Sequence, residues 1–170
     1  MRSDDEELLA RIRRGDLDAY DCLIRRWFPL VFIYLQYFGP DPALAQAYAD
    51  YLLTEIVGRV YPRRKDRSFG AKAWLFKQIR HRSKRLANLC ASDWDVEPPA
   101  EISPADRMLL AKARKVPQAW MKSVFFTLLL RFSIAQTAWI LGEPEEEIPE
   151  MVRLGIEDLQ IRDQREEESE

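Results

Sequence analysis

Hydrophobic side chains recur at intervals of three and four residues through most of the chain, and the strict alternation expected of half-buried strands is nearly absent. This spacing predicts a protein built from helices. The predicted helices cover about residues 3–14, 18–38, 43–60, 70–89, 105–115 and 117–131, and a helix-turn-helix is predicted over 133–159. The predicted fold class is therefore all-α.

Capping residues mark several of the predicted helix ends. Asp16 or Asp18 can accept hydrogen bonds from the first backbone N–H groups of the helix 18–38. Ser133, with Gln136 three residues later, forms a capping box at the start of the helix-turn-helix. Gly142 stands where a glycine commonly closes a helix, so it is expected to end the first helix of that motif.

Two residues within the predicted helix 18–38 call for comment. Pro29 is expected to kink or break the helix, because proline lacks the backbone donor and its ring clashes with the preceding turn. Cys22 lies in an apolar helical pattern, where a buried cysteine usually behaves as a small hydrophobic residue. A nucleophilic pair of Cys22 and His81 is the alternative, but we expect Cys22 to be buried and not to act as a nucleophile.

The stretch 91–104 has little periodicity and is rich in acidic residues and proline, which is typical of a linker. It divides the chain into two predicted helical domains, 1–90 and 105–164. The second is a helix-turn-helix domain, and residues 165–170 form an acidic tail that is expected to be disordered.

Composition excludes several classes of protein. At 170 residues and 47% hydrophobic content the chain can bury cores, but no apolar run approaches the ~20 residues of a membrane span, and the first residues do not resemble a signal peptide. A cytoplasmic protein without a membrane partner is predicted. Cys22, Cys90 and His81 have no metal-ligand spacing, and no nucleotide-binding or hydrolase motif is present. We expect neither an enzyme nor a cofactor, metal or small-molecule ligand.

Charge is distributed unevenly along the chain, although the formal net charge is only −2. The segment from Arg59 to Arg85 contains eleven basic residues and one acidic residue, Asp66, whereas acidic residues outnumber basic ones from Glu143 onward. The basic segment indicates binding to nucleic acid or to an acidic partner, with a solvated helix face as the alternative. The acids at 145–147 are open to a second interpretation as well, because acidic residues at the start of a helix also stabilise its dipole.

Aromatic and large apolar residues fall into two groups. Those at helical spacing are expected to be core residues: Trp74, Phe76, Ile79, Trp120, Phe125, Leu129 and Trp139. Phe69 and Trp94 lie in predicted loops, so they are the better candidates for contacts with unstacked bases.

Several runs occur in an order typical of one family. These are Asp4-Asp5-Glu6-Glu7-Leu8-Leu9, Gly15-Asp16, Ala19-Tyr20, Arg25-Arg26-Trp27, Pro29-Leu30-Val31, the segment 49–55 with Arg59-Val60-Tyr61, Trp74-Leu75-Phe76 with Ile79-Arg80-His81, Val116-Pro117, and 133–142. The chain resembles bacterial sigma factors of the extracytoplasmic-function (ECF) group of the sigma-70 family, over nearly its whole length.

The resemblance implies a function and a set of sites. In that family the first domain binds the β′ coiled coil of core RNA polymerase and melts promoter DNA, and the second places its last helix in the major groove of the upstream promoter element. The positions that match the polymerase-binding helix are Tyr51, Thr54 and Glu55. The positions that would face promoter DNA are Arg63, Arg64, Lys65, Lys77, Arg80, His81, Arg82, Lys84 and Arg85. An anti-sigma factor or other inhibitory regulator is a further expected partner.

The chain also departs from the family. The usual Asp-Leu-x-Gln signature is Tyr51-Leu52-Leu53-Thr54 here. Where the family usually shows Lys or Arg in the last helix, this chain has Pro149, Met151, Leu154, Ile156, Glu157 and Asp158. Such a helix repels phosphates, so we do not expect it to read the upstream element. Two hypotheses follow: a divergent ECF sigma factor, or a sigma-like interaction protein whose partner contacts Glu145, Glu146, Glu147 and Glu150.

Overall fold

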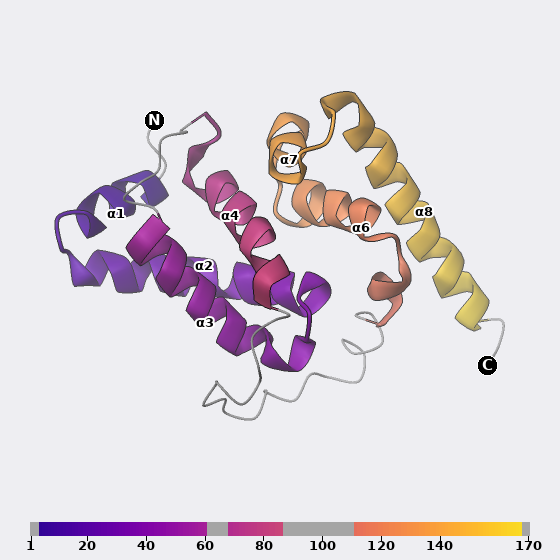
Figure 1. Ribbon diagram of the computed structural model, residues 1–170. Helices are drawn as coiled ribbons and strands as arrows, with labels where there is room; N and C mark the ends of the chain where they lie inside the picture. The colour runs from indigo at the N-terminus through magenta and orange to yellow at the C-terminus, as the bar shows by residue number, and fades with distance from the viewer. Residues whose placement is uncertain (1–3, 61–67, 87–110, 168–170) are drawn as a thin grey trace. The chain divides into compact units, whose positions relative to one another are not determined.

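The computed structural model describes residues 4–60, 68–86 and 111–167 (Figure 1). All regular structure in these residues is helical, and the chain divides into two compact units, Met1–Pro99 and Ala100–Glu170. The predicted all-α class with two helical units is therefore confirmed. The predicted linker 91–104 lies outside the described residues, as do Arg63, Arg64, Lys65, Cys90 and Trp94.

In its described residues, 4–60 and 68–86, the first unit packs four α-helices around one core. Its elements are α1 (Asp4–Ile12), α2 (Leu17–Phe38), a 3-10 turn (Pro42–Leu44), α3 (Ala45–Glu55), a π-helix (Ile56–Val60) and α4 (Gly70–Leu86). Figure 1 shows α3 crossing α2, and the two helices pack against each other. Buried residues from three helices meet there, and the rings of Tyr34 on α2 and Phe76 on α4 touch edge to face with their centroids 5.9 Å apart. This core fixes the relative positions of α3 and α4, which carry the candidate site residues.

The corner between α1 and α2 is built from polar contacts. Asp16 is the N-cap of α2 and accepts a hydrogen bond from the backbone N–H of Ala19 at 2.9 Å, so of the two predicted caps it is Asp16 that serves. The Arg11 guanidinium lies 2.8 Å from the Asp16 carboxylate. These two contacts, the backbone bond first, lower the pKa of Asp16. Gly15 has φ of +86°, a conformation that glycine adopts without strain, and so makes the sharp turn possible.

The structure bears on two expectations for α2. The helix continues past Pro29 to Phe38, so Pro29 does not break it, and the kink remains a prediction. Pro29 is exposed, whereas Trp27 and Val31 on either side of it are buried, and their packing outweighs the loss of one backbone hydrogen bond. Cys22 is exposed as well, because the buried stripe of α2 runs through Leu23 and leaves the preceding residue on the outer side.

The second unit contains the predicted helix-turn-helix. Residues 111–115 are helical and are followed by α6 (Gln118–Val124), a π-helix (Phe125–Leu129), α7 (Ile134–Leu141), a 3-10 turn (Glu145–Glu147) and α8 (Ile148–Glu167). The side chain of Ser133 accepts from the backbone N–H of Gln136, and the side chain of Gln136 accepts in return from the N–H of Ser133, which confirms the capping box. Gly142 ends α7 with φ of +70°, also as predicted.

The last helix extends into the segment that was predicted to be a disordered tail. α8 begins at Ile148, so Pro149 lies in its first turn, where its missing donor does no harm. The helix continues through Glu167, so residues 165–167 of the predicted disordered tail are helical. Residues 168–170 lie outside the described part of the chain.

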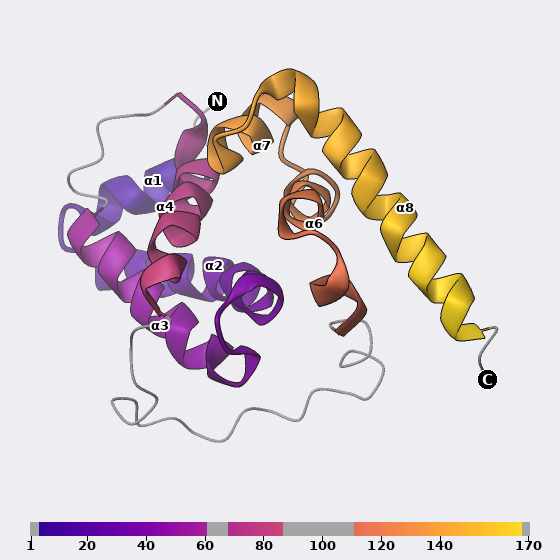
Figure 2. The ribbon, with the colours of Figure 1, turned by 45° about the vertical axis from the view of Figure 1, so that its right-hand side comes forward.

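A glycine brings α8 close to α6 (Figure 2). A Cβ atom built on Gly155 would lie 2.7 Å from Cγ2 of Val124 and 3.1 Å from the carbonyl oxygen of Trp120, so only glycine fits this contact unchanged. Phe125 is buried as expected, but Leu129 is 58% exposed. The prediction that Leu129 belongs to the core is therefore wrong, and the reason is the π-helix at 125–129, whose wider turn shifts the helical register.

None of the described helices is both long enough and apolar enough to cross a lipid bilayer.

Candidate functional site

Helix α4 carries both core residues and a row of basic residues. Trp74, Phe76 and Ile79 are buried, as predicted, and pack into the core of the first unit. Lys77, His81, Lys84 and Arg85 share one helix face at three- and four-residue spacing, and Trp74 is buried at the N-terminal end of that face. His81, Lys84 and Arg85 are exposed, and Lys77 is half-buried. We call these four residues the α4 stripe.

The α4 stripe has the dimensions of a backbone-binding surface. From Lys77 to Arg85 the helix rises ~12 Å, and successive phosphates on one strand of a duplex are ~3.4 Å apart along the axis. A row of cations of this length can therefore contact several consecutive phosphates. None of the four residues is an acid, and Lys77, Lys84 and Arg85 are cations.

Arg82 lies to the side of the stripe and contacts an acid. Its Nη1 lies 2.7 Å from Oε1 of Glu55, the last residue of α3. Only 22% of the Arg82 side chain and 24% of the Glu55 side chain are exposed. The structure thus brings together two residues that the sequence assigned to different partners, DNA and polymerase.

The two other predicted polymerase-binding residues lie on the outer side of α3. Tyr51 is 42% exposed and Thr54 is exposed, while Leu52 and Leu53 between them are buried. The hydroxyl of Tyr20 on α2 lies 3.5 Å from Oγ1 of Thr54. Tyr20 thereby joins this surface, and the 34-residue separation between it and Thr54 left no local signal in the sequence.

The acidic residues of the second unit surround the start of α8. Glu145, Glu146 and Glu147 are exposed in the 3-10 turn that precedes this helix. Within α8, Arg153 donates from Nε to Glu150 Oε2 at 2.8 Å and from Nη1 to Glu157. The hydrogen bond from Arg153 lowers the pKa of Glu150.

The pairing of Arg153 leaves this surface acidic. Arg153 is the one cation in residues 143–161 of the sequence, and both of its ion pairs are formed within its own helix. No basic side chain of that segment therefore remains to attract a phosphate. A basic or amide-rich protein surface is the better electrostatic match for it.

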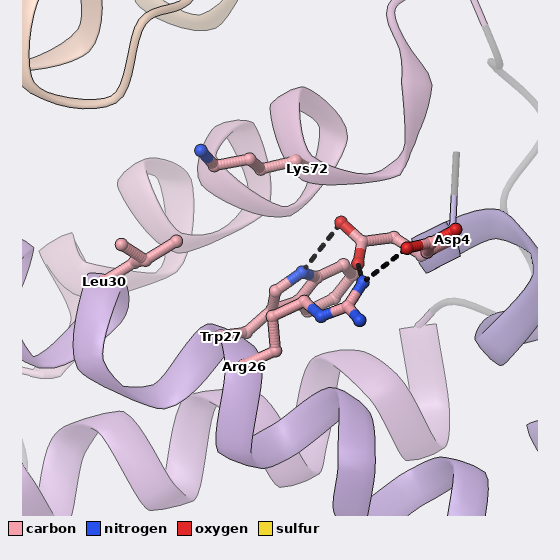
Figure 3. Close-up of a pocket in the computed structure, with 6 residues that line it drawn as sticks. Asp4, Arg26, Trp27, Leu30 and Lys72 are labelled. Atoms are coloured by element: carbon pink, nitrogen blue, oxygen red, sulfur yellow. Dashed lines mark hydrogen bonds and ion pairs between the residues drawn. The ribbon is translucent and has the colours of Figure 1, made fainter.

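A small cavity lies on the other side of α4. It has a volume of about 350 Å³ and is lined by Asp4, Asp5, Arg26, Trp27, Leu30 and Lys72 (Figure 3). Asp5 accepts hydrogen bonds from Arg26 at 2.9 Å and from the indole N–H of Trp27 at 3.1 Å. Burial lowers the pKa of Lys72, and the nearby charge of Asp5 opposes that effect. Two acids and two bases line the cavity, so their charges balance. The polar contacts of Asp5 join α1 to α2 beside Lys72 of α4.

The sequence also singled out Phe69, Trp94, Cys22 and His81. Phe69 is half-buried directly before α4, and Trp94 lies outside the described residues. Cys22 and His81 are both exposed, on α2 and α4. Within 4–60, 68–86 and 111–167, no three His, Cys, Asp or Glu side chains gather closely enough to hold a metal ion.

Comparison with known proteins shows the fold. No protein-family model matches the sequence, and no curated protein is significantly similar to it. Among solved structures, CnrH in complex with the cytosolic domain of CnrY matches with a TM-score of 0.64 and 16% identity, over 92% of this chain and 95% of that one. The RsbN–BldN complex matches 89% of this chain and 96% of that one at 18% identity and a TM-score of 0.40. The likeness to CnrH shows that this chain shares the fold of that protein.

Proposed function

We propose that this chain is an ECF-type sigma factor that recruits core RNA polymerase for promoter-specific transcription initiation. The observation that carries the proposal is the α4 stripe, an exposed basic row on the first unit of a chain with a sigma-factor fold. Tyr51 and Thr54 provide a separate exposed surface on α3 that is suited to a protein partner. One compact unit thus offers one surface to polymerase and another to DNA.

The proposed mechanism uses electrostatic capture followed by strand opening. Lys77, Lys84 and Arg85 displace counterions from the phosphate backbone, which supplies affinity that does not depend on sequence. Extrusion of a nontemplate base costs a few kcal/mol, which contacts with the first unit offset. Polymerase performs the chemistry, so the sigma factor needs no catalytic residue or cofactor of its own. This function places the chain in the cytoplasm, where its polymerase partner works.

The second unit has a reduced role in this proposal. Each phosphate that a protein neutralises contributes ~0.9 to the slope of log affinity against log salt concentration, and the segment 143–161 has no unpaired cation to contribute. Tight binding of the upstream element through residues 148–161 of α8 is therefore not expected. Promoter choice then depends mainly on the first unit.

In vitro transcription tests the proposal. Purified chain and cognate core polymerase are incubated with fragmented genomic DNA, and the start sites are mapped. We expect discrete starts that require the chain, and we expect Lys84→Gln with Arg85→Gln to reduce them at least tenfold. Arg14→Gln removes an exposed positive charge from the turn between α1 and α2 and serves as the control. Absence of core binding and of starts with the unmodified chain would refute a sigma-factor function.

The acidic surface of the second unit favours a second candidate function. Glu145, Glu146, Glu147 and Glu150 are exposed, and the solved structure of CnrH contains the cytosolic domain of CnrY. We propose as the alternative a sigma-like interaction protein that binds an anti-sigma factor or another regulator through these residues. Replacement of Glu145, Glu146 and Glu147 by Lys should weaken that complex. The alternative fails if these replacements restore DNA binding and leave the affinity for the regulator unchanged.

A further inference from the structure

The Glu55–Arg82 ion pair joins the helix that offers a surface to polymerase to the helix that carries the α4 stripe. The two residues are 27 positions apart in sequence, their side chains are about three-quarters buried, and the contact is 2.7 Å long. Nε of Arg82 is enclosed completely. The geometry is thus that of an internal contact and not that of two solvated surface charges.

Packing fixes both ends of this contact. Leu52 and Leu53 precede Glu55 and are fully buried, and Ile56 and Val57 follow it and are equally buried. Ile56 also begins the π-helix, a wider turn that is uncommon and often occurs at functional positions. On the other helix, Ile79, Ser83 and Leu86 are buried on the turns next to Arg82. Neither backbone segment can shift without disturbing the core.

Movement of the Arg82 side chain toward a phosphate would be unfavourable, because it would break the ion pair with Glu55. A phosphate contact would require the guanidinium to leave Glu55, whose carboxylate would then remain three-quarters buried without its partner. His81, Lys84 and Arg85 need no such rearrangement, because they are already exposed. These residues therefore bind phosphate before Arg82 does.

We infer that Glu55 and Arg82 are positioning residues: their ion pair holds the α4 stripe in place relative to the outer surface of α3, and neither side chain contacts polymerase or DNA itself. The inference rests on the proposed function, since it assigns polymerase to α3 and DNA to α4. It removes Glu55 from the polymerase-binding residues and Arg82 from the DNA-binding residues that the resemblance implied. It also couples binding at the two surfaces through an internal contact that adds to the core packing between α3 and α4.

The salt dependence of DNA binding tests the role of Arg82. The full chain is titrated with promoter duplex at several salt concentrations, free and bound to core polymerase. Arg85→Gln, the matched control on the stripe, should lower the log-log slope by ~0.9, whereas Arg82→Gln should leave the slope unchanged. An equal loss of slope in both variants would show that Arg82 contacts phosphate and would overturn the inference, as would a wild-type chain that binds no duplex at low salt.

Promoter opening, followed by permanganate reactivity of unpaired thymines, tests the pair itself. Arg82→Gln and Glu55→Gln should each reduce opening about tenfold, and the exchanged pair, Glu55→Arg with Arg82→Glu, should recover most of the loss. An exchanged pair that folds but opens no better than the single variants would overturn the inference. So would a loss of polymerase affinity confined to the Glu55 variants. If the wild-type chain fails to bind core polymerase, the proposed function fails, while the salt slopes still decide whether Arg82 contacts phosphate.

Discussion

Replacement of Gly155 by alanine should destabilise the second unit, because α8 rests against α6 at this residue. The new Cβ would lie 2.7 Å from Cγ2 of Val124, about 1 Å closer than the usual contact distance between carbon atoms. Val124 is β-branched and has little rotamer freedom in a helix, and the carbonyl oxygen of Trp120 at 3.1 Å belongs to the backbone. Neither neighbour can yield at low cost.

Two opposing effects set the magnitude. Overpacking of a tight contact costs ~1–3 kcal/mol. Alanine regains ~1 kcal/mol over glycine through its higher helix propensity. We therefore expect Gly155→Ala to lower the free energy of unfolding by about 1 kcal/mol, the difference between these two effects. For a unit of this size that corresponds to a decrease in melting temperature of roughly 4–8 °C.

Urea unfolding of the full chain, followed by circular dichroism, measures this effect. Gly58→Ala is the matched control, since Gly58 is also helical but a Cβ there would meet nothing within 4 Å. Adding Val124→Ala should relieve the clash, so the double variant should be more stable than the sum of the single effects by more than ~0.5 kcal/mol. Additive effects, or a stabilised Gly155→Ala variant, would refute the close approach of α8 to α6.

Three further predictions concern single contacts. Ser133→Ala removes the N-cap of α7 and should cost about 1 kcal/mol in urea unfolding, with Ser133→Asp retaining most of the stability. Trp27→Phe removes the indole donor to the part-buried Asp5 and should cost about 1 kcal/mol in the same assay; no loss would mean that water replaces the donor. Arg153→Gln should make the second unit less sensitive to acid. Arg153 lowers the pKa of Glu150, so this pair stabilises the fold above the unfolded pKa of that carboxyl, and its contribution is lost over the range from that pKa down through the lowered pKa of the folded state. Thermal melts of both proteins across that range should converge, and a constant difference would contradict the assignment.

Helix ends were predictable wherever the deciding chemistry is local. Ser133 and Gln136 are three residues apart and satisfy each other's backbone N–H groups, so their roles follow from sequence spacing alone. The same holds for Asp16 and for Gly142, whose positive φ is a property of a single residue. Pro29 shows the limit of such rules, because tertiary packing of α2 preserved a helix that local preference opposed.

The candidate site was predictable only in part, since its geometry depends on contacts between distant residues. The sequence identified the basic segment, and the helical period could have separated Lys77, His81 and Arg85 from Arg82. It could not show that Arg82 meets Glu55 across 27 residues, because a contact of this kind depends on how α3 and α4 pack. The exposure of Leu129 likewise depended on a π-helix that has no clear sequence signature.

The continuous course of α2 through Pro29 has a consequence for the motions of the first unit. Proline has no amide proton, so the carbonyl of Arg25, four residues earlier, lacks its partner within the helix and must be hydrated from the exposed side. The ladder of backbone hydrogen bonds is thinnest there, near the middle of the 22-residue helix. Amide hydrogens on the two halves of α2 can therefore exchange with solvent through separate openings, one beside α1 and one nearer Phe38. A continuous helix can thus act as two dynamic segments within one core.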